Sequence, residues 1–260
     1  MDKEKLQYFL EQVSRLKINL KTNNYTKNTA ASIYNLLPAF CEIYSNYTHE
    51  LITTFPQILL FCNFCLKNGD KLLESICILS KADTNMIDAM SRFRLATQMV
   101  RCLKIFINVD NTTYIDIPCA EKTYKSFSDI LRRICHHQST VNELLLSLAM
   151  KSLFDCFLIK KQDPRWREIA FDSILPILQN YMDSKLIDFI SKNNVISHYL
   201  NQIVTLAEIN EKSENIYIAA ENLINLIVYM LNSSVQVDYA IITEFNSKFG
   251  YEIFISFIKR

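Results

Sequence analysis

Apolar residues recur at the spacing of an amphipathic α-helix along most of the 260-residue chain, most clearly over residues 141–182. One helical face in the first half of this stretch carries Leu146, Met150, Leu153 and Phe157. The second half repeats the period with Trp166, Ala170, Ser173, Ile174, Ile177 and Tyr181. Side chains three, four and seven positions apart share one face of a helix. The stretch therefore predicts a helical hairpin with a polar hinge at residues 160–166.

The hinge contains a helix-start signal, because Asp163 is followed directly by Pro164. An aspartate before a helix accepts hydrogen bonds from free backbone N–H groups, and a proline at the first helical position gives up no needed donor. We therefore expect the second helix of the hairpin to begin at Pro164.

The rest of the chain shows the same apolar stripes, separated by short polar breaks. We expect further helices over residues 2–21, 26–47, 51–67, 70–80, 84–109, 121–137, 184–192, 195–209, 213–231 and 237–260, the last broken at Phe249 and Gly250. Residues 110–119 form the clearest loop, because the residue before Pro118 is driven out of helical geometry. The pattern predicts roughly a dozen helices.

The composition favours an all-α fold, because the chain has two glycines and five prolines. Glycine supplies the tight turns of sheets and the close backbone approach of phosphate loops. Consecutive antiparallel helices with short connections predict an irregular armadillo/HEAT-like α-solenoid, although no strict repeat is evident. A compact helical bundle is the alternative. We expect a single domain over residues 1–260, with a soft division near residues 110–119.

Charge and hydropathy indicate neither a nucleic-acid nor a membrane partner, and the cysteines indicate a cytoplasmic protein. The net charge of +1 gives no reason to expect nucleic acid or an anionic membrane as a partner. The uncharged runs at residues 51–66 and 222–237 are interrupted by Pro56 or by polar side chains, so we expect no transmembrane segment and only indirect membrane association. The eight cysteines lie mostly in apolar segments, which is typical of buried reduced thiols.

No catalytic, cofactor-binding or metal-ligating set emerges from the motifs. Cys62 and Cys65 form a CxxC within an apolar helix, without the second ligand pair that a zinc site needs. Cys135, His136 and His137 are adjacent, so their side chains diverge on a helix. We interpret both groups as packing or helix-end residues, and we expect no cofactor and no enzymatic activity.

Several residues are candidates for binding a partner protein. A basic face of residues 84–109 carries Arg92, Arg94, Arg101 and Lys104; it is typical of a solvated face, with an acidic partner or a phosphate as the alternative. Trp166 has the spacing of a core residue but is also a possible anchor. At the C-terminal end, the stripe of Ile253, Phe254, Phe257 and Ile258 predicts self-association or a further helical layer. The candidates are therefore Trp166, Arg94, Arg101, Phe254 and Phe257.

Four segments, taken in order, resemble the N-terminal armadillo-like region of large BEACH-domain proteins of the ALFY / Blue cheese type, which carry WD-repeat and FYVE domains. They read YNLLPAF followed by LLFC (residues 34–40 and 59–62), MVRCLKIF leading into the 110–118 loop (residues 99–106), DPRWREIA (residues 163–170) and the aromatic-Gly-Tyr segment that opens the last helix (residues 245–260). Each is mainly a helix-packing pattern, and their order carries the resemblance.

The resemblance implies a non-enzymatic scaffold in vesicle trafficking or selective autophagy, peripheral to endomembranes, whose partners are other proteins. The BEACH, WD-repeat and FYVE modules themselves have no counterpart in this sequence. A helical small-ligand-binding protein or enzyme is the alternative function. It would require at least two of a set of titratable residues to converge on one pocket, namely His136, His137, His198, Glu143 and Asp155.

Overall fold

A computed structural model describes residues 84–92, 94–108, 117–156, 164–209 and 214–259 of the chain. It also describes Glu4, Gln7, Tyr8, Glu11, Leu73, Ile76, Cys77, Ile78, Ser80 and Lys81. All regular secondary structure within these residues is helical, which confirms the all-α prediction. The helices expected over 26–47 and 51–67, together with most of 2–21 and 70–80, lie outside the described residues, as does the Cys62/Cys65 motif.

The described helices follow one another with short connections. In chain order they are α5 (Thr84–Arg92), α6 (Leu95–Asn108), α7 (Ile117–Ile134), α8 (Gln138–Leu146), α9 (Ala149–Asp155), α10 (Pro164–Asn180), α11 (Ser184–Lys192), α12 (Val195–Glu208), α13 (Glu214–Ser234), α14 (Ala240–Ser247) and α15 (Gly250–Ile258).

The order of these helices is repetitive. A short first helix of eight or nine residues (α5, α8, α11 and α14) leads through one residue in the left-handed conformation into a second helix (α6, α9, α12 and α15). The left-handed residues are Arg94, Leu148, Asn194 and Phe249, with φ between 50° and 59°. A long third helix of 17 to 21 residues then follows as α7, α10 and α13. Among the described residues, α14 and α15 are the first and second helices of a fourth such three-helix group.

Two of the predicted helices are each divided by a left-handed residue. The prediction of one helix over residues 84–109 is wrong, because Arg94 separates α5 from α6. The first helix of the predicted hairpin is likewise divided at Leu148. Leu146 is therefore 87% exposed at the end of α8, and its assignment to the core face is wrong, whereas Met150 and Leu153 on α9 are fully buried. Phe157 lies outside the described residues.

Other predicted boundaries are confirmed. Helix α10 begins at Pro164, and its Ala170, Ser173, Ile174 and Ile177 are buried as expected. Helix α11 spans the predicted residues 184–192, and the last segment breaks at Phe249. Helix α7, however, begins at Ile117 and not at residue 121, so Pro118 lies in its first turn, where the missing N–H is not needed.

The chain divides into two compact units. Unit 1 consists of residues 1–102 and 109–143, and unit 2 of residues 103–108 and 144–260. Buried residues of unit 1 include Leu73 and Ile76 and, on α5 to α8, Ile87, Met90, Met99, Val100, Phe127, Ile130, Leu131 and Val141. The single domain with a soft division near residues 110–119 stays a prediction.

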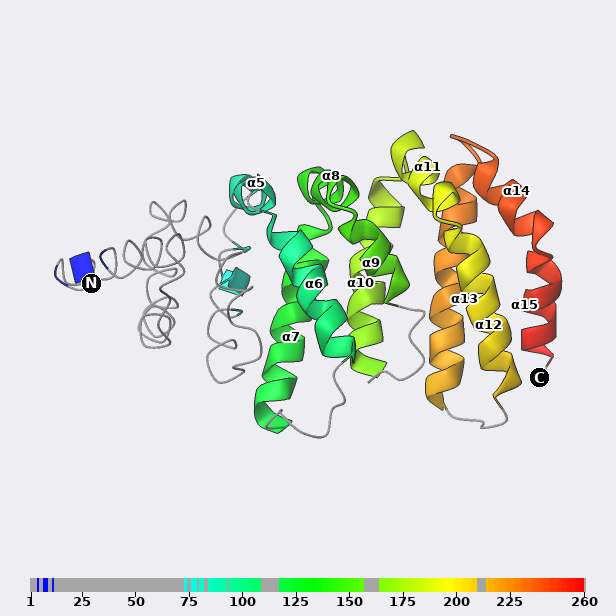
Figure 1. Ribbon diagram of the computed structural model, residues 1–260, viewed down its shortest axis with the longest axis horizontal. Coiled ribbons are helices and arrows are strands. Elements are labelled where there is room, and N and C mark those ends of the chain that lie inside the picture. Colours follow the sequence, from blue (N-terminus) through cyan, green and yellow to red (C-terminus); the bar gives the residue numbers. More distant parts are fainter. Residues whose placement is uncertain are drawn as a thin grey trace. The chain divides into compact units, whose positions relative to one another are not determined.

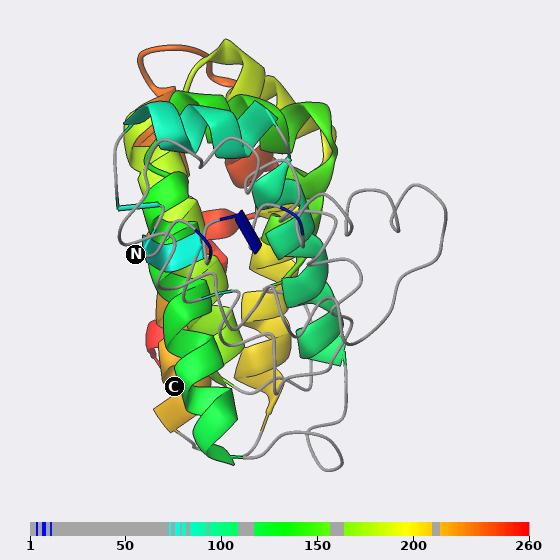
Figure 2. The ribbon, with the colours of Figure 1, turned by 90° about the vertical axis from the view of Figure 1, so that its left-hand side faces the viewer.

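Within unit 2, helices at equivalent places in the repeated order pack on one another. Helix α10 packs on α13, α11 on α14, and α12 on α15, while α12 also contacts α13 and α14. Helices α10, α12, α13 and α15 run alongside one another, with α11 and α14 at one end of them (Figure 1). In the perpendicular view α12 is set to one side of α13 (Figure 2). The core of unit 2 therefore lies between successive layers of helices.

An aromatic cluster joins three helices of this core. The ring centroid of Phe154 on α9 lies 6.2 Å from that of Phe189 on α11 and 6.2 Å from that of Tyr199 on α12. The Tyr199 hydroxyl donates a hydrogen bond to the Phe154 carbonyl oxygen at 3.2 Å, so this fully buried phenol has a polar partner.

Candidate functional site

The predicted basic face is divided in the structure. Arg92 lies on α5, Arg94 is the left-handed residue after it, and Arg101 and Lys104 lie on α6; all four are exposed. They therefore do not form the single helix face that was predicted, because the chain turns at Arg94. Arg94 and Arg101 both belong to unit 1, and both stay accessible to a partner.

The three aromatic candidates differ in their surroundings. Trp166 lies in the first turn of α10, and its side chain is outside the described residues. Phe254 and Phe257 on α15 are half-buried. The Phe254 ring centroid lies 5.4 Å from that of Phe245 on α14, and the Phe257 centroid lies 6.3 Å from that of Tyr217 on α13. Both phenylalanines thus face neighbouring helices of unit 2, and their role in binding stays a prediction.

The cysteine and histidines after α7 occupy different environments. The Cys135 thiol is fully buried, and burial, with the nearby Glu143, raises its pKa well above the ordinary value. His136 beside it is exposed and His137 is half-buried. Within the described residues, no group of three or more His, Cys, Asp or Glu side chains is placed to hold a metal ion. The adjacent residues therefore lie in different surroundings, as expected for a helix end.

A buried carboxylate ties two helices of unit 1 together. Oε1 of Glu143, on α8, accepts hydrogen bonds from the backbone N–H and the hydroxyl of Thr97, each at 2.7 Å. Thr97 is the third residue of α6, where backbone N–H groups lack a partner within the helix. Burial raises the pKa of Glu143 to about 7, and the hydrogen bonds from Thr97 oppose that shift. Glu143 therefore caps a helix that lies 46 residues earlier in the chain.

The same tie recurs in unit 2. Oε1 of Glu244, on α14, accepts from the backbone N–H of Ser197 at 3.0 Å and from its hydroxyl at 2.6 Å. Ser197 is the third residue of α12. In both ties the hydroxyl lies three residues after one left-handed residue, and the glutamate lies five residues before another. Neither tie was predicted from the sequence; the two residues of a tie lie 46 residues apart in unit 1 and 47 in unit 2.

The residues that the ligand-binding alternative would bring together have separate surroundings. In unit 1, His136 is exposed while Glu143 is buried and bonded to Thr97. In unit 2, His198 is exposed on α12, and Asp155 is half-buried at the end of α9. The carboxylate with the most perturbed pKa thus already serves as a helix cap.

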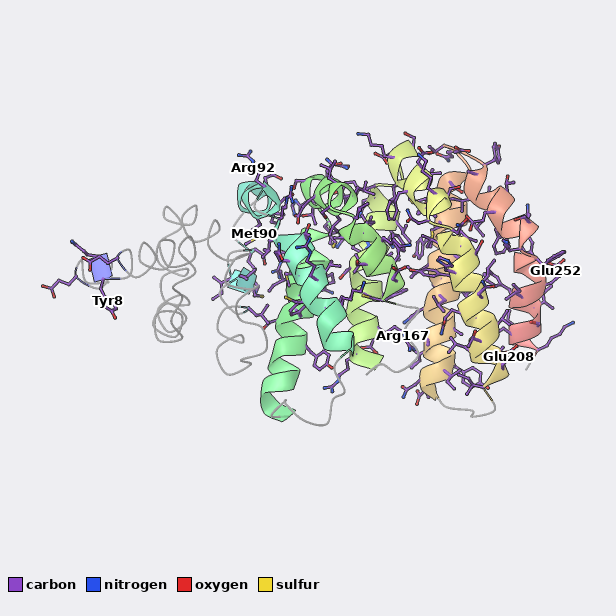
Figure 3. All side chains as sticks on the ribbon, viewed as in Figure 1. Tyr8, Met90, Arg92, Arg167, Glu208 and Glu252 are labelled. Carbon is purple, nitrogen blue, oxygen red and sulfur yellow. The ribbon has the colours of Figure 1, made fainter. Side chains whose placement is uncertain are left out.

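Several exposed apolar side chains of unit 2 lie on its last described helices. Tyr251, Ile255 and Ile258 on α15 are exposed, and so are Tyr217, Ile218, Val228 and Tyr229 on α13. Glu252, which follows Tyr251 in the sequence, lies on α15 (Figure 3). Contiguous exposed apolar residues with a polar rim are typical of interaction sites. The stripe of Tyr251, Ile255 and Ile258 on α15 is the candidate that the geometry favours.

Among the described helices, α13 is long and apolar enough to cross a membrane by length and composition alone. A single helix that passes this test by length and composition is weak evidence for a membrane span. The described residues contain no clear transmembrane segment.

No protein-family model matches the sequence, and no curated protein matches it. The resemblance to BEACH-domain scaffolds stays a prediction from the sequence motifs.

Proposed function

We propose that the chain is a non-enzymatic protein-interaction scaffold, built as an irregular armadillo/HEAT-like α-solenoid. The observation that carries this proposal is the packing of equivalent helices in unit 2, where α10, α11 and α12 pack on α13, α14 and α15 respectively. Repeats that bury their cores against their neighbours leave extended outer surfaces for partners.

The use of the buried polar groups supports a structural rather than a catalytic role. Glu143 and Glu244 cap helices, and the Tyr199 hydroxyl bonds to a carbonyl oxygen. The thiols of Cys102, which is half-buried, and of Cys156, which is buried, are poor nucleophiles, because partial or full burial raises the pKa of Cys102 to about 11 and that of Cys156 to about 12. These groups fix helices in place and leave no activated nucleophile among themselves.

The cellular setting follows from the resemblance alone. The order of the four segments supports a cytoplasmic scaffold in vesicle trafficking or selective autophagy, peripheral to endomembranes and bound to other proteins. Arg94 and Arg101 are the predicted partner-binding residues that are fully accessible on unit 1. An acidic protein surface is the partner that suits them.

The test is affinity capture of the full chain from its native cells, with quantitative mass spectrometry. We compare the wild type with the double variant Arg94→Glu/Arg101→Glu, and use Arg132→Glu, an exposed arginine on α7, as the matched control. We expect a reproducible set of captured proteins, enriched in trafficking or autophagy components, which is depleted with the double variant and retained with the control.

A capture in which no protein exceeds background would contradict the scaffold proposal. If a small molecule co-purifies in its place, the ligand-binding alternative is favoured. Captured proteins unrelated to trafficking would support the scaffold proposal but contradict the cellular role that the resemblance implies.

A further inference from the structure

The exposed apolar stripe of α15 occupies positions that are buried in the other second helices. Counted from the left-handed residue, these are the second, sixth and ninth positions. In α6 they are Ala96, Val100 and Leu103, and in α12 they are Ile196, Leu200 and Ile203; all six are at most 1% exposed. In α15 they are Tyr251, Ile255 and Ile258, which are 64%, 51% and 77% exposed.

The neighbours of α12 show what normally covers this stripe. Helix α12 contacts α13, α14 and α15, which follow it in the chain. Helix α12 therefore has neighbours both before it (α11) and after it, whereas the described neighbours of α15, α12 and α14, both precede it. Three large apolar side chains on one face of α15 are therefore exposed at positions where this architecture places core residues.

We propose that this stripe binds α15 of a second copy of the chain, in an antiparallel arrangement about a two-fold axis beside Ile255. Such an interface is isologous, so each contact occurs twice. Tyr251 then lies against Ile258 of the second copy, and the two Ile255 side chains meet at the axis. The inference rests on the repeated helix order used in the proposed function, and it names one partner for that scaffold.

Charge complementarity identifies the occupant as a second copy. Glu252 on α15 and Lys259, the residue that caps its C-terminal end, are both exposed and lie seven residues, or about two turns, apart, next in sequence to Tyr251 and Ile258 of the stripe. The antiparallel two-fold arrangement brings Glu252 of each copy next to Lys259 of the other, which gives two ion pairs. Antiparallel helix dipoles attract as well. The net charge of +1 adds little repulsion between copies.

The expected association is weak, because α15 has nine residues and its stripe is small beside the roughly 1,200–2,000 Å² that stable complexes bury. We measure it by sedimentation velocity of the full chain over a wide concentration range. The variant Ile255→Glu places two carboxylates at the axis and should weaken dimerisation at least about tenfold. Leu146→Glu, which changes an exposed leucine at the end of α8, is the matched control and should keep the wild-type constant. Circular dichroism verifies that each variant is folded.

Each of these charges also stabilises α15 itself, because Glu252 lies near the positive end of the helix dipole and Lys259 near the negative end. Charge reversal distinguishes this effect from ion pairing between two copies. Glu252→Lys and Lys259→Glu should each weaken dimerisation, because each creates two like-charged pairs. Their equimolar mixture should dimerise again, because the mixed dimer has opposite charges at both pairs. Restored association on mixing supports the antiparallel arrangement.

A wild-type chain that stays monomeric overturns the inference, as does a dimer indifferent to Ile255→Glu or a mixture that stays monomeric. A monomeric chain that still captures other proteins through Arg94 and Arg101 overturns this inference and leaves the proposed function intact. A dimer with the expected variant pattern and no captured protein supports this inference and contradicts the proposed function.

Discussion

Glu143 caps the first turn of α6 from a helix that begins 30 residues after α6 ends, by accepting both the backbone N–H and the hydroxyl of Thr97 at 2.7 Å. Glu244 and Ser197 repeat this relationship in unit 2. In each case a carboxylate from the first helix of one three-helix group holds the start of the second helix of an earlier group. Each tie therefore joins two helices of one unit through residues that lie 46 or 47 positions apart in the sequence.

Replacing Thr97 by valine tests the contribution of the tie. Thr97→Val keeps the shape of the side chain but removes the hydroxyl donor from a buried carboxylate, so we expect a loss of about 1–3 kcal/mol in the free energy of unfolding. Thr205→Val is the control, because the Thr205 hydroxyl is exposed and bonds within its own helix; its effect should stay within about 0.5 kcal/mol. Denaturant unfolding measures both, and equal effects would contradict a special role for the tie.

The raised pKa of Glu143 predicts a pH dependence. The folded protein keeps the Glu143 proton up to about pH 7, whereas the unfolded chain releases it near the ordinary value of 4.5. Between these values the folded state binds more protons, so its stability falls as the pH rises and then stays low above about pH 7. The maximal loss is about 3 kcal/mol.

The comparison of Glu143→Gln with the wild type isolates this dependence. Because glutamine does not titrate, the variant should gain stability relative to the wild type as the pH rises from about 4.5 to about 7. Glu221→Gln, which alters an exposed carboxylate on α13, should leave the wild-type pH profile nearly unchanged. A constant difference between Glu143→Gln and the wild type across this range would refute the assignment.

The sequence predicts helices well where their ends carry a chemical signal. Pro164 marks the start of α10, and Gly250 marks the break before α15; both are confirmed. The breaks at Arg94 and Leu148 were missed, because neither residue is of a type that favours the left-handed conformation. The chain has two glycines, and this low number indicated helices. It also means that most helix breaks carry no glycine by which they could be predicted.

The candidate surface was foreseen only in part. The C-terminal stripe was predicted to be apolar and in need of a partner, but a helical period alone does not say which flank faces the protein. The packing directs Phe254 and Phe257 toward α14 and α13 and leaves Ile255 and Tyr251 exposed. The partner of Glu143 was not foreseen, because only the repeated order of helices brings Thr97 to it.

The left-handed conformation of Leu148 predicts a stabilising glycine substitution. This conformation costs a non-glycine residue roughly 1–2 kcal/mol, and glycine avoids that cost while losing roughly 0.5–1 kcal/mol in backbone entropy. The Leu148 side chain is 71% exposed, so little burial is lost. We expect Leu148→Gly to stabilise the chain by about 0.5–1 kcal/mol in thermal or denaturant unfolding. Lys151→Gly, at an exposed position inside α9, should destabilise it by about 1 kcal/mol, and a stabilising effect of both would refute the argument.

Gly250 is expected to reject alanine, although alanine normally stabilises a helix by about 1 kcal/mol relative to glycine. A Cβ at residue 250 would collide with the buried ring of Phe245, which is itself held between Tyr251 and Phe254 at 4.9 and 5.4 Å. In the other three-helix groups, the residues four before and one after the left-handed residue are Met90/Leu95, Leu144/Ala149 and Ile190/Val195. Where the first residue is smaller than phenylalanine, the second is therefore larger than glycine. Gly250→Ala should therefore lower the free energy of unfolding by about 1–3 kcal/mol. In the Phe245→Leu background, where it recreates the Leu144/Ala149 pair, the same substitution should cost less. A double-mutant cycle by denaturant unfolding measures this coupling, and a coupling energy near zero would show that the two positions do not share one space.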